Sequence, residues 1–196
     1  MLKKLWPISK KRKPLSMEVA CINIGCGLDI RQGWLNCDKE PRLPSVVSFD
    51  INDDVDLAWL KTGSFRIVEC NHVVGYLNLG QAKRFFATVL ASLQVGGKLI
   101  LEFPDLDKIM LGMQAMGKSS YTQNTYIEWV RAIYAFDAPD AEALDFAKPT
   151  YVFGWTSDFL FQVLLEVGFD NIVVLDPETH GKRIYRDSRI EAYRGC

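Results

Sequence analysis

Short apolar runs alternate with turn-forming and acidic residues in the first part of the chain. These runs occupy residues 19–24, 34–38, 46–51 and 66–74. Short apolar runs bounded by turn residues predict buried strands. The second and third runs end at or near an acid, Asp38 and Asp50 respectively. Between the third and fourth runs, Asp54–Leu60 is predicted to form a short helix.

A longer helix is predicted where apolar residues recur with helical spacing. Positions i, i+3, i+4, i+7, i+8 and i+11 are Ala82, Phe85, Phe86, Val89, Leu90 and Leu93. They form one continuous apolar face, and Gly96-Gly97 is predicted to end the helix as a left-handed cap. Residues 98–103 follow directly as a buried strand that ends at Pro104. A helix that returns at once to a strand implies a parallel sheet with packed helices.

The C-terminal part adds one clear helix and two closing strands. Ser157–Val167 is predicted to be helical because Thr156 or Ser157 can cap its start and Gly168 suits its end. The strands are predicted at residues 171–175 and 188–193. The whole order predicts an α/β fold with an open sheet, in which ligands bind at the carboxyl ends of the strands.

The charge distribution divides the chain into a basic tail, residues 1–16, and a single domain, residues 17–196. Residues 1–13 hold six Lys/Arg and no acid, so the remainder has a net charge of −7. An acidic body is a poor electrostatic match for nucleic acid, and no nucleic-acid partner is expected. The tail is either a weak contact for an anionic membrane or a solubilising segment, and we expect it to be dispensable for folding.

Cysteine and histidine content argue against a disulfide framework and a metal site. The five cysteines are odd in number and have no CxxC spacing, which favours reduced thiols and a cytoplasmic location. With only His72 and His180 available, no metal is expected. No apolar run approaches the roughly 18 residues that span a bilayer.

Candidate ligand-binding residues gather at three predicted strand ends. Gly25-Cys26-Gly27 lets backbone N–H groups approach a ligand, Asp38 can accept hydrogen bonds from a ribose diol, and Asp50 can accept from an adenine amino group. A nicotinamide dinucleotide is disfavoured because Ile30 stands where the third glycine of GxGxxG belongs. Only seven residues separate Gly27 from Leu35, which leaves no room for a pyrophosphate-binding helix.

Five segments together resemble small bacterial class I S-adenosylmethionine-dependent methyltransferases. They are Asn23-Ile24-Gly25-Cys26-Gly27, Gly33-Trp34-Leu35-Asn36-Cys37-Asp38, Asn71-His72-Val73-Val74, Val95-Gly96-Gly97-Lys98-Leu99 and Pro104-Asp105-Leu106. The resemblance implies a Rossmann-like, doubly wound sheet, mostly parallel, with an antiparallel last strand inserted in it. It also implies S-adenosylmethionine as cofactor. The glycine turn would hold the methionine part, Asp38 the ribose and Asp50 with Ile51 the adenine, and Asn23 and Asn71 belong to the same set.

One segment differs from the family pattern. Where many relatives have the sequence HVLEHL, residues 72–77 of this chain have Gly75 and Tyr76 in place of the glutamate and the second histidine. His72 is the best-placed general base for a hydroxyl acceptor; alternatively, it only tethers the loop. Asp105 and Tyr76 are reserve candidates.

Residues 107–155 are predicted to form a lid over the acceptor, with one helix around residues 106–116 and another around residues 126–134. Nine of the chain's 23 aromatic residues lie in this part, either for stacking on a substrate or for packing the lid.

Three functions stay open at this point. The first is methyl transfer to a small-molecule acceptor, such as a sugar or glycan-precursor hydroxyl. The second is a cofactor-binding but inactive partner subunit, and the third is a nicotinamide oxidoreductase.

Overall fold

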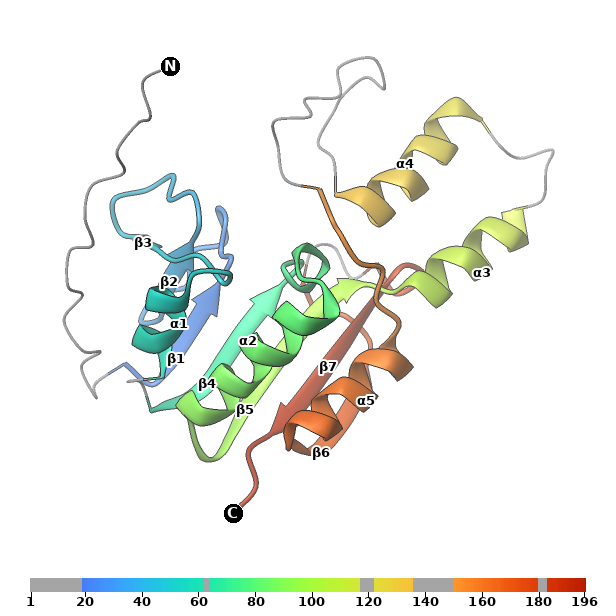
Figure 1. Ribbon diagram of the computed structural model, residues 1–196. Coiled ribbons are helices and arrows are strands. Elements are labelled where there is room, and N and C mark those ends of the chain that lie inside the picture. Colours follow the sequence, from blue (N-terminus) through green and yellow to red (C-terminus); the bar gives the residue numbers. More distant parts are fainter. Residues whose placement is uncertain (1–18, 62–63, 117–121, 136–149, 180–182) are drawn as a thin grey trace, which may run out of the picture.

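The computed structural model describes residues 19–61, 64–116, 122–135, 150–179 and 183–196 (Figure 1). These residues form a seven-stranded sheet with the order β3-β2-β1-β4-β5-β7-β6. The strands are β1 Cys21–Ile24, β2 Leu35–Asp38, β3 Val47–Ser48, β4 Phe65–Asn71, β5 Leu93–Pro104, β6 Asp170–Leu175 and β7 Asp187–Tyr193. Only β7 runs antiparallel to its neighbours, β5 and β6. The predicted sheet, mostly parallel with an inserted antiparallel last strand, is therefore confirmed.

The central position of β1 brings three strand ends together. β1 pairs in parallel with β2 on one side, through Ile24 and Cys37, and with β4 on the other, through Asn23 and Glu69. Because parallel strands end at the same edge of a sheet, the loops after β1, β2 and β4 meet there.

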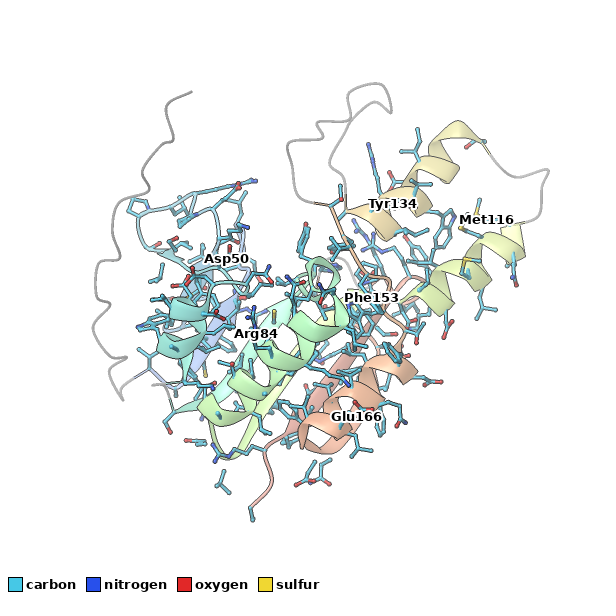
Figure 2. All side chains as sticks on the ribbon, viewed as in Figure 1. Asp50, Arg84, Met116, Tyr134, Phe153 and Glu166 are labelled. Atoms are coloured by element: carbon cyan, nitrogen blue, oxygen red, sulfur yellow. The ribbon has the colours of Figure 1, made fainter. Side chains whose placement is uncertain are left out.

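Helices α1 (Asp54–Leu60), α2 (Leu79–Ser92) and α5 (Ser157–Val167) cover one face of the sheet (Figure 1). α2 lies in the middle and contacts both other helices. Its predicted apolar face is buried, with Phe85, Phe86 and Val89 at most 1% exposed. Exposed ion pairs on the outer side, Arg84–Asp54 and Lys83–Glu166, also join α2 to its neighbours (Figure 2).

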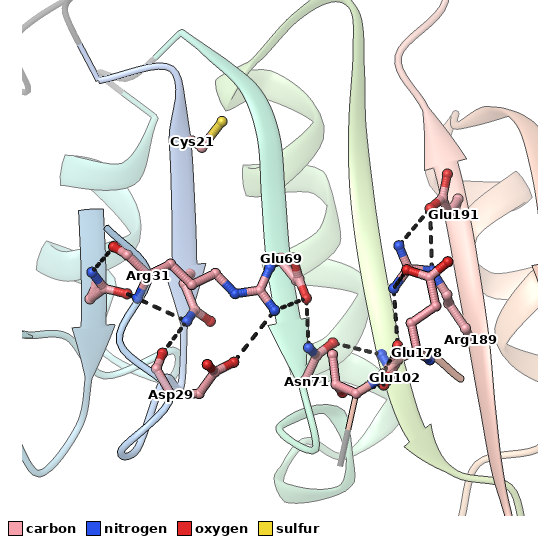
Figure 3. A network of polar contacts seen from close by, with 12 residues as sticks. Cys21, Asp29, Arg31, Glu69, Asn71, Glu102, Glu178, Arg189 and Glu191 are labelled. Carbon is pink, nitrogen blue, oxygen red and sulfur yellow. Dashed lines mark hydrogen bonds and ion pairs between the residues drawn. The ribbon is translucent and has the colours of Figure 1, made fainter. Parts of the chain in front are cut away.

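A polar network lies on the other face of the sheet (Figure 3). Side chains alternate along β4, so the core residues Val68 and Cys70 point to the helices and Glu69 points away from them. The buried Glu69 carboxylate accepts from the Arg31 guanidinium and from Asn71.

The network continues across β5 and β7. Glu102 is fully buried, which by itself would raise its pKa, but Thr179, the Glu178 backbone and Arg189 donate hydrogen bonds that hold the pKa below its ordinary value. Arg189 also bonds Glu191 at 2.7 Å. These buried charges depend on one another, because removing Arg189 or one of its carboxylate partners would leave a buried charge without a counter-charge and destabilise the fold.

Helices α3 (Leu106–Met116) and α4 (Gln123–Tyr134) pack against each other beyond the carboxyl end of β5 and the amino end of β7 (Figure 1). The Trp129 indole of α4 donates to the Met116 sulfur of α3 at 3.0 Å. Both helices lie where helical spacing predicts them. Among the described helices, none is both long and apolar enough to cross a membrane.

Three boundary predictions are wrong. Gly96-Gly97 does not end α2: the helix stops at Ser92, and both glycines belong to β5 because Leu93 already pairs with Phe65. The strand expected over residues 66–74 ends at Asn71, since Val74–Tyr76 forms a 3-10 turn. The strand expected over residues 46–51 is reduced to β3 because only two of its residues pair with β2.

Helix α5 provides a matched test of core packing, since Leu164 is fully buried and its neighbour Leu165 is 52% exposed. Leu164→Ala should lower the free energy of unfolding by about 2–5 kcal/mol, through lost burial and a cavity. Leu165→Ala should change it by about 0.5 kcal/mol or less. Urea denaturation followed by circular dichroism measures both. Equal losses would show that α5 does not pack on the sheet by the face described.

Candidate functional site

A cleft of about 940 Å³ opens at the carboxyl ends of β1, β2 and β4. Its volume lies within the range of small-molecule and cofactor sites. All nine residues predicted for the site line it: Asn23, Gly25, Cys26, Gly27, Asp38, Asp50, Ile51, Asn71 and His72. The structure thus brings together residues from four separate segments of the chain.

The glycine turn after β1 forms the floor of the cleft. Gly25 has a φ of +71°, and a Cβ there would lie 2.1 Å from Cγ2 of Val73, so only glycine fits against the loop after β4. Gly27 has a φ of +53° and open space where a Cβ would stand. A ligand can therefore approach the backbone closely at Gly27.

Asp38, at the end of β2, fixes this turn. Its Oδ2 accepts from Gly27 N at 2.9 Å and its Oδ1 accepts from Glu40 N at 2.8 Å. An ionised carboxylate offers about four acceptor positions, so two remain for a ligand. Burial, and then the Asp38 charge, raise the pKa of the Cys26 thiol to about 11. Cys26 is thus a neutral thiol at pH 7 rather than a nucleophile.

Asp50, two residues after the end of β3, also lines the cleft. Its Oδ1 accepts from Asn52 N at 2.9 Å, and its Oδ2 lies 3.1 Å from the Lys39 ammonium. Asp56, on α1, accepts from Asp50 N at 2.7 Å and so holds the loop. Ile51, 8% exposed, adds an apolar wall.

The two predicted asparagines shape the site from within. Asn23 donates to the Asp29 carbonyl at 2.8 Å, which ties the loop between β1 and β2 to the sheet. Asn71 donates to Glu69 and accepts from Glu102 N at 3.1 Å. These groups bond to the protein itself, so the direct role that the resemblance implies for both asparagines stays a prediction.

His72 follows β4 in a strained backbone conformation. Its φ of +55° is uncommon for a residue with a side chain and costs on the order of 1 kcal/mol. Two hydrogen bonds hold it: His72 N donates to the Glu102 carbonyl at 2.7 Å, and the Tyr151 hydroxyl donates to His72 O at 3.0 Å. The imidazole Nε2 lies 3.8 Å from Oδ2 of Asp187.

Tyr151 explains the departure at Gly75 and Tyr76. A Cβ at Gly75 would lie 2.6 Å from the Tyr151 ring, so a glutamate cannot occupy that position beside it. Tyr76 meets the same ring edge-on, with centroids 4.7 Å apart. Burial raises the pKa of Tyr151, which keeps its hydroxyl a hydrogen-bond donor. No local sequence signal marked Tyr151 or Asp187 as neighbours of His72.

The other candidates have different surroundings. Asp105 is buried and accepts from Ser188 Oγ and from the backbone of Asp107 and Ser157, so it joins α3, α5 and β7 rather than lining the cleft. Tyr76 does line it. His180 and the aromatic residues Tyr121, Phe136 and Phe146 lie outside the described residues.

Several aromatic rings of the predicted lid pack on the core. Trp155 is 1% exposed, donates to the Val74 carbonyl at 3.0 Å and contacts Phe153 with centroids 4.6 Å apart. Thr150 and Val152 from the same segment line the cleft. Packing therefore accounts for these two rings.

The connection between β1 and β2 bears on the dinucleotide alternative. The structure describes all of residues 25–34, and they form turns rather than a helix. A helix N-terminus that could bind a pyrophosphate is thus missing from this stretch.

Solved structures with the same fold include several methyltransferases. A SAM-dependent methyltransferase from Archaeoglobus fulgidus matches with a TM-score of 0.54 and 13% identity, over 88% of this chain and 85% of that chain. The carbon methyltransferase CurJ matches with a TM-score of 0.53 and 16% identity, over 94% of this chain and 50% of that chain. PigF, solved with SAH, matches with a TM-score of 0.50 and 12% identity, over 90% of this chain and 50% of that chain.

This chain therefore spans about half the length of CurJ and PigF. No protein-family model matches the sequence, and no curated protein matches it. The similarity in structure gives the class of fold: the chain has the Rossmann-like fold of class I S-adenosylmethionine-dependent methyltransferases.

Asp38 gives the sharpest test of the cleft. Asp38→Ala should weaken binding of S-adenosylhomocysteine at least tenfold, because two charge-assisted hydrogen bonds to a ribose, roughly 1.5 kcal/mol or more each, are lost. Glu40→Ala is the matched control, since it removes a nearby cleft carboxylate but keeps the backbone N–H that Asp38 accepts. Calorimetry on folded variants measures both affinities. Unchanged binding by Asp38→Ala would refute the ribose role.

Proposed function

We propose that this protein binds S-adenosylmethionine in the cleft and transfers its methyl group to a hydroxyl of a small molecule. The observation that carries the proposal is the hydrogen bond from the Gly27 main chain to Asp38. It places a carboxylate beside an open stretch of backbone, inside a cleft of the size that holds a cofactor. The methyltransferase fold of the solved structures and the SAH in PigF support it.

Each part of the cofactor has a candidate partner among the cleft residues. Asp38 would accept from the ribose diol and Gly27 would lie against the methionine part. Asp50 and the apolar Ile51 would hold the adenine. The bound cofactor supplies a methyl group on a positively charged sulfur, so the protein has mainly to align the acceptor with it.

The acceptor would enter beside the loop after β4. That side of the cleft is lined by His72, Val73, Tyr76, Thr150 and Val152, whereas the charged lining residues, Asp29, Asp38, Lys39, Glu40, Arg42 and Asp50, belong to the β1–β3 loops. An uncharged acceptor suits such a lining, and an aromatic ring such as that of Tyr76 can stack on the apolar face of a sugar. A sugar or glycan-precursor hydroxyl is therefore the acceptor class that we propose.

His72 would act as the general base. The cofactor would supply the methyl group and keep the electron pair of its carbon–sulfur bond, and the imidazole would accept the proton that the acceptor hydroxyl loses. Such a base contributes about 10²–10⁴-fold to the rate.

A methylation screen with labelled cofactor and a panel of uncharged sugars and glycosides tests the proposal. On the acceptor so found, His72→Ala should keep its affinity for S-adenosylhomocysteine and lose turnover by about 10²-fold or more. The control is His180→Ala, which replaces the second histidine of the sequence and should keep wild-type turnover. Near-wild-type turnover in His72→Ala would leave alignment as the whole mechanism. A folded protein that binds the cofactor but methylates nothing would favour the inactive-subunit alternative.

A further inference from the structure

We propose that Asp187 is a positioning residue for His72: its carboxylate orients the imidazole and stabilises the protonated ring, while Arg186 limits that effect. The proposal deepens the function proposed above and rests on it for its catalytic meaning. The geometry it uses is independent of any bound ligand.

The contact joins two elements that are far apart in sequence. His72 follows β4, and Asp187 is the first residue of β7, where it pairs with Pro104 of β5. Nε2 of His72 is buried and lies 3.8 Å from Oδ2 of Asp187. That distance suits an ion pair with an imidazolium rather than a direct hydrogen bond.

Burial and hydrogen bonds restrict the Asp187 carboxylate to its position beside His72. It is 1% exposed, and its two oxygens accept from Nε and Nη2 of Arg186 at 2.6 and 2.7 Å. Its backbone is held as well, because Lys108 donates to the Asp187 carbonyl at 2.8 Å. The carboxylate is thus fixed in place by groups other than the histidine that it faces.

The position of Asp187 bears on which imidazole nitrogen of His72 can accept a proton from a ligand in the cleft. A buried carboxylate beside Nε2 favours the neutral tautomer that carries its proton on that atom. Nδ1 is then the nitrogen that can accept a proton from an acceptor in the cleft, which His72 lines. Once it is protonated, the ring gains from the negative charge of Asp187.

The surrounding charged and titratable groups come from five parts of the chain. Arg186 and Asp187 lie at the start of β7, Lys108 on α3, Tyr151 on the segment before α5 and Tyr76 on the turn after β4. Glu102 of β5 presents its backbone to His72, while its carboxylate bonds Arg189 and Thr179. Asp187 is thus a buried carboxylate beside the imidazole, and Arg186 is a cation bonded to that carboxylate.

The proposal is tested by titrating His72 directly, with no acceptor needed. The 196-residue chain has two histidines, so its imidazole NMR spectra contain the signals of two rings, and His180→Gln assigns them. Asp187→Asn should lower the pKa of His72 by roughly one unit or more, because Arg186 then faces the ring without its counter-charge. Arg186→Gln should raise it, because Asp187 then acts alone.

Ser188→Ala is the matched control, since Ser188 is also buried at the start of β7 but bonds Asp105. It should leave the His72 pKa within a few tenths of a unit of the wild-type value. An unchanged His72 pKa in either Asp187→Asn or Arg186→Gln, whichever is folded, overturns the proposal. If Asp187→Asn fails to fold, Arg186→Gln alone decides.

The same variants separate this proposal from the proposed function. Asp187→Asn should bind S-adenosylhomocysteine as tightly as wild type, and its kcat profile should shift to lower pH by the same amount as the NMR titration. If wild type binds no S-adenosylhomocysteine, the proposed function fails, yet the titration still decides whether Asp187 controls His72.

Discussion

The contact between Gly25 and Val73 is the constraint on which the shape of the cleft depends. It presses the turn after β1 against the loop after β4, and no side chain larger than hydrogen fits at position 25. The main-chain N–H groups of Gly25 and Cys26 both donate to the Cys37 carbonyl of β2, which adds the third strand end. Because these contacts hold the three loops together, Asp38 can accept a hydrogen bond from Gly27 N. The cleft that the loops line therefore has a fixed floor.

Val73 also connects this floor to the proposed chemistry, because it is the neighbour of His72. The strained backbone of His72 persists because β5 holds its N–H and Tyr151 holds its carbonyl. Surroundings that over-determine a strained residue are typical of functional sites. Where many relatives have a glutamate, this chain has Gly75, and the ring of Tyr151 occupies the space that a side chain would need. The Tyr151 hydroxyl in turn fixes the loop through its bond to the His72 carbonyl.

Local signals made some elements predictable from the sequence. α5 begins and ends where expected because Thr156 accepts from Phe159 N and Gly168 adopts the left-handed conformation, both within a few residues of the helix. The end of β2 at Asp38 was predicted in the same way from a short apolar run, whereas β3 ends at Ser48, two residues before Asp50. Strand-end reasoning predicted the glycine turn, Asp38 and Asp50 as candidate cofactor residues, and the family resemblance added Asn23, Ile51 and Asn71.

Features set by distant pairing could not be predicted. Gly96-Gly97 suggested a helix end, but the pairing of Leu93 with Phe65 extends β5 back to the helix. The approach of Asp187 to His72 depends on an antiparallel strand inserted beside β5, and the pairing of Arg31 with Glu69 depends on a loop folding over the sheet. Neither pair has a sequence spacing that marks it.

Calorimetric titration of the 196-residue chain with S-adenosylhomocysteine and, separately, with NAD tests most directly which ligand the cleft binds. One S-adenosylhomocysteine is expected to bind per chain, because Asp38 lies beside the open backbone of Gly27. NAD is expected not to bind at similar concentrations, because residues 25–34 form no helix that could hold a pyrophosphate. Binding of NAD by the folded protein, or no binding of S-adenosylhomocysteine, would contradict these expectations.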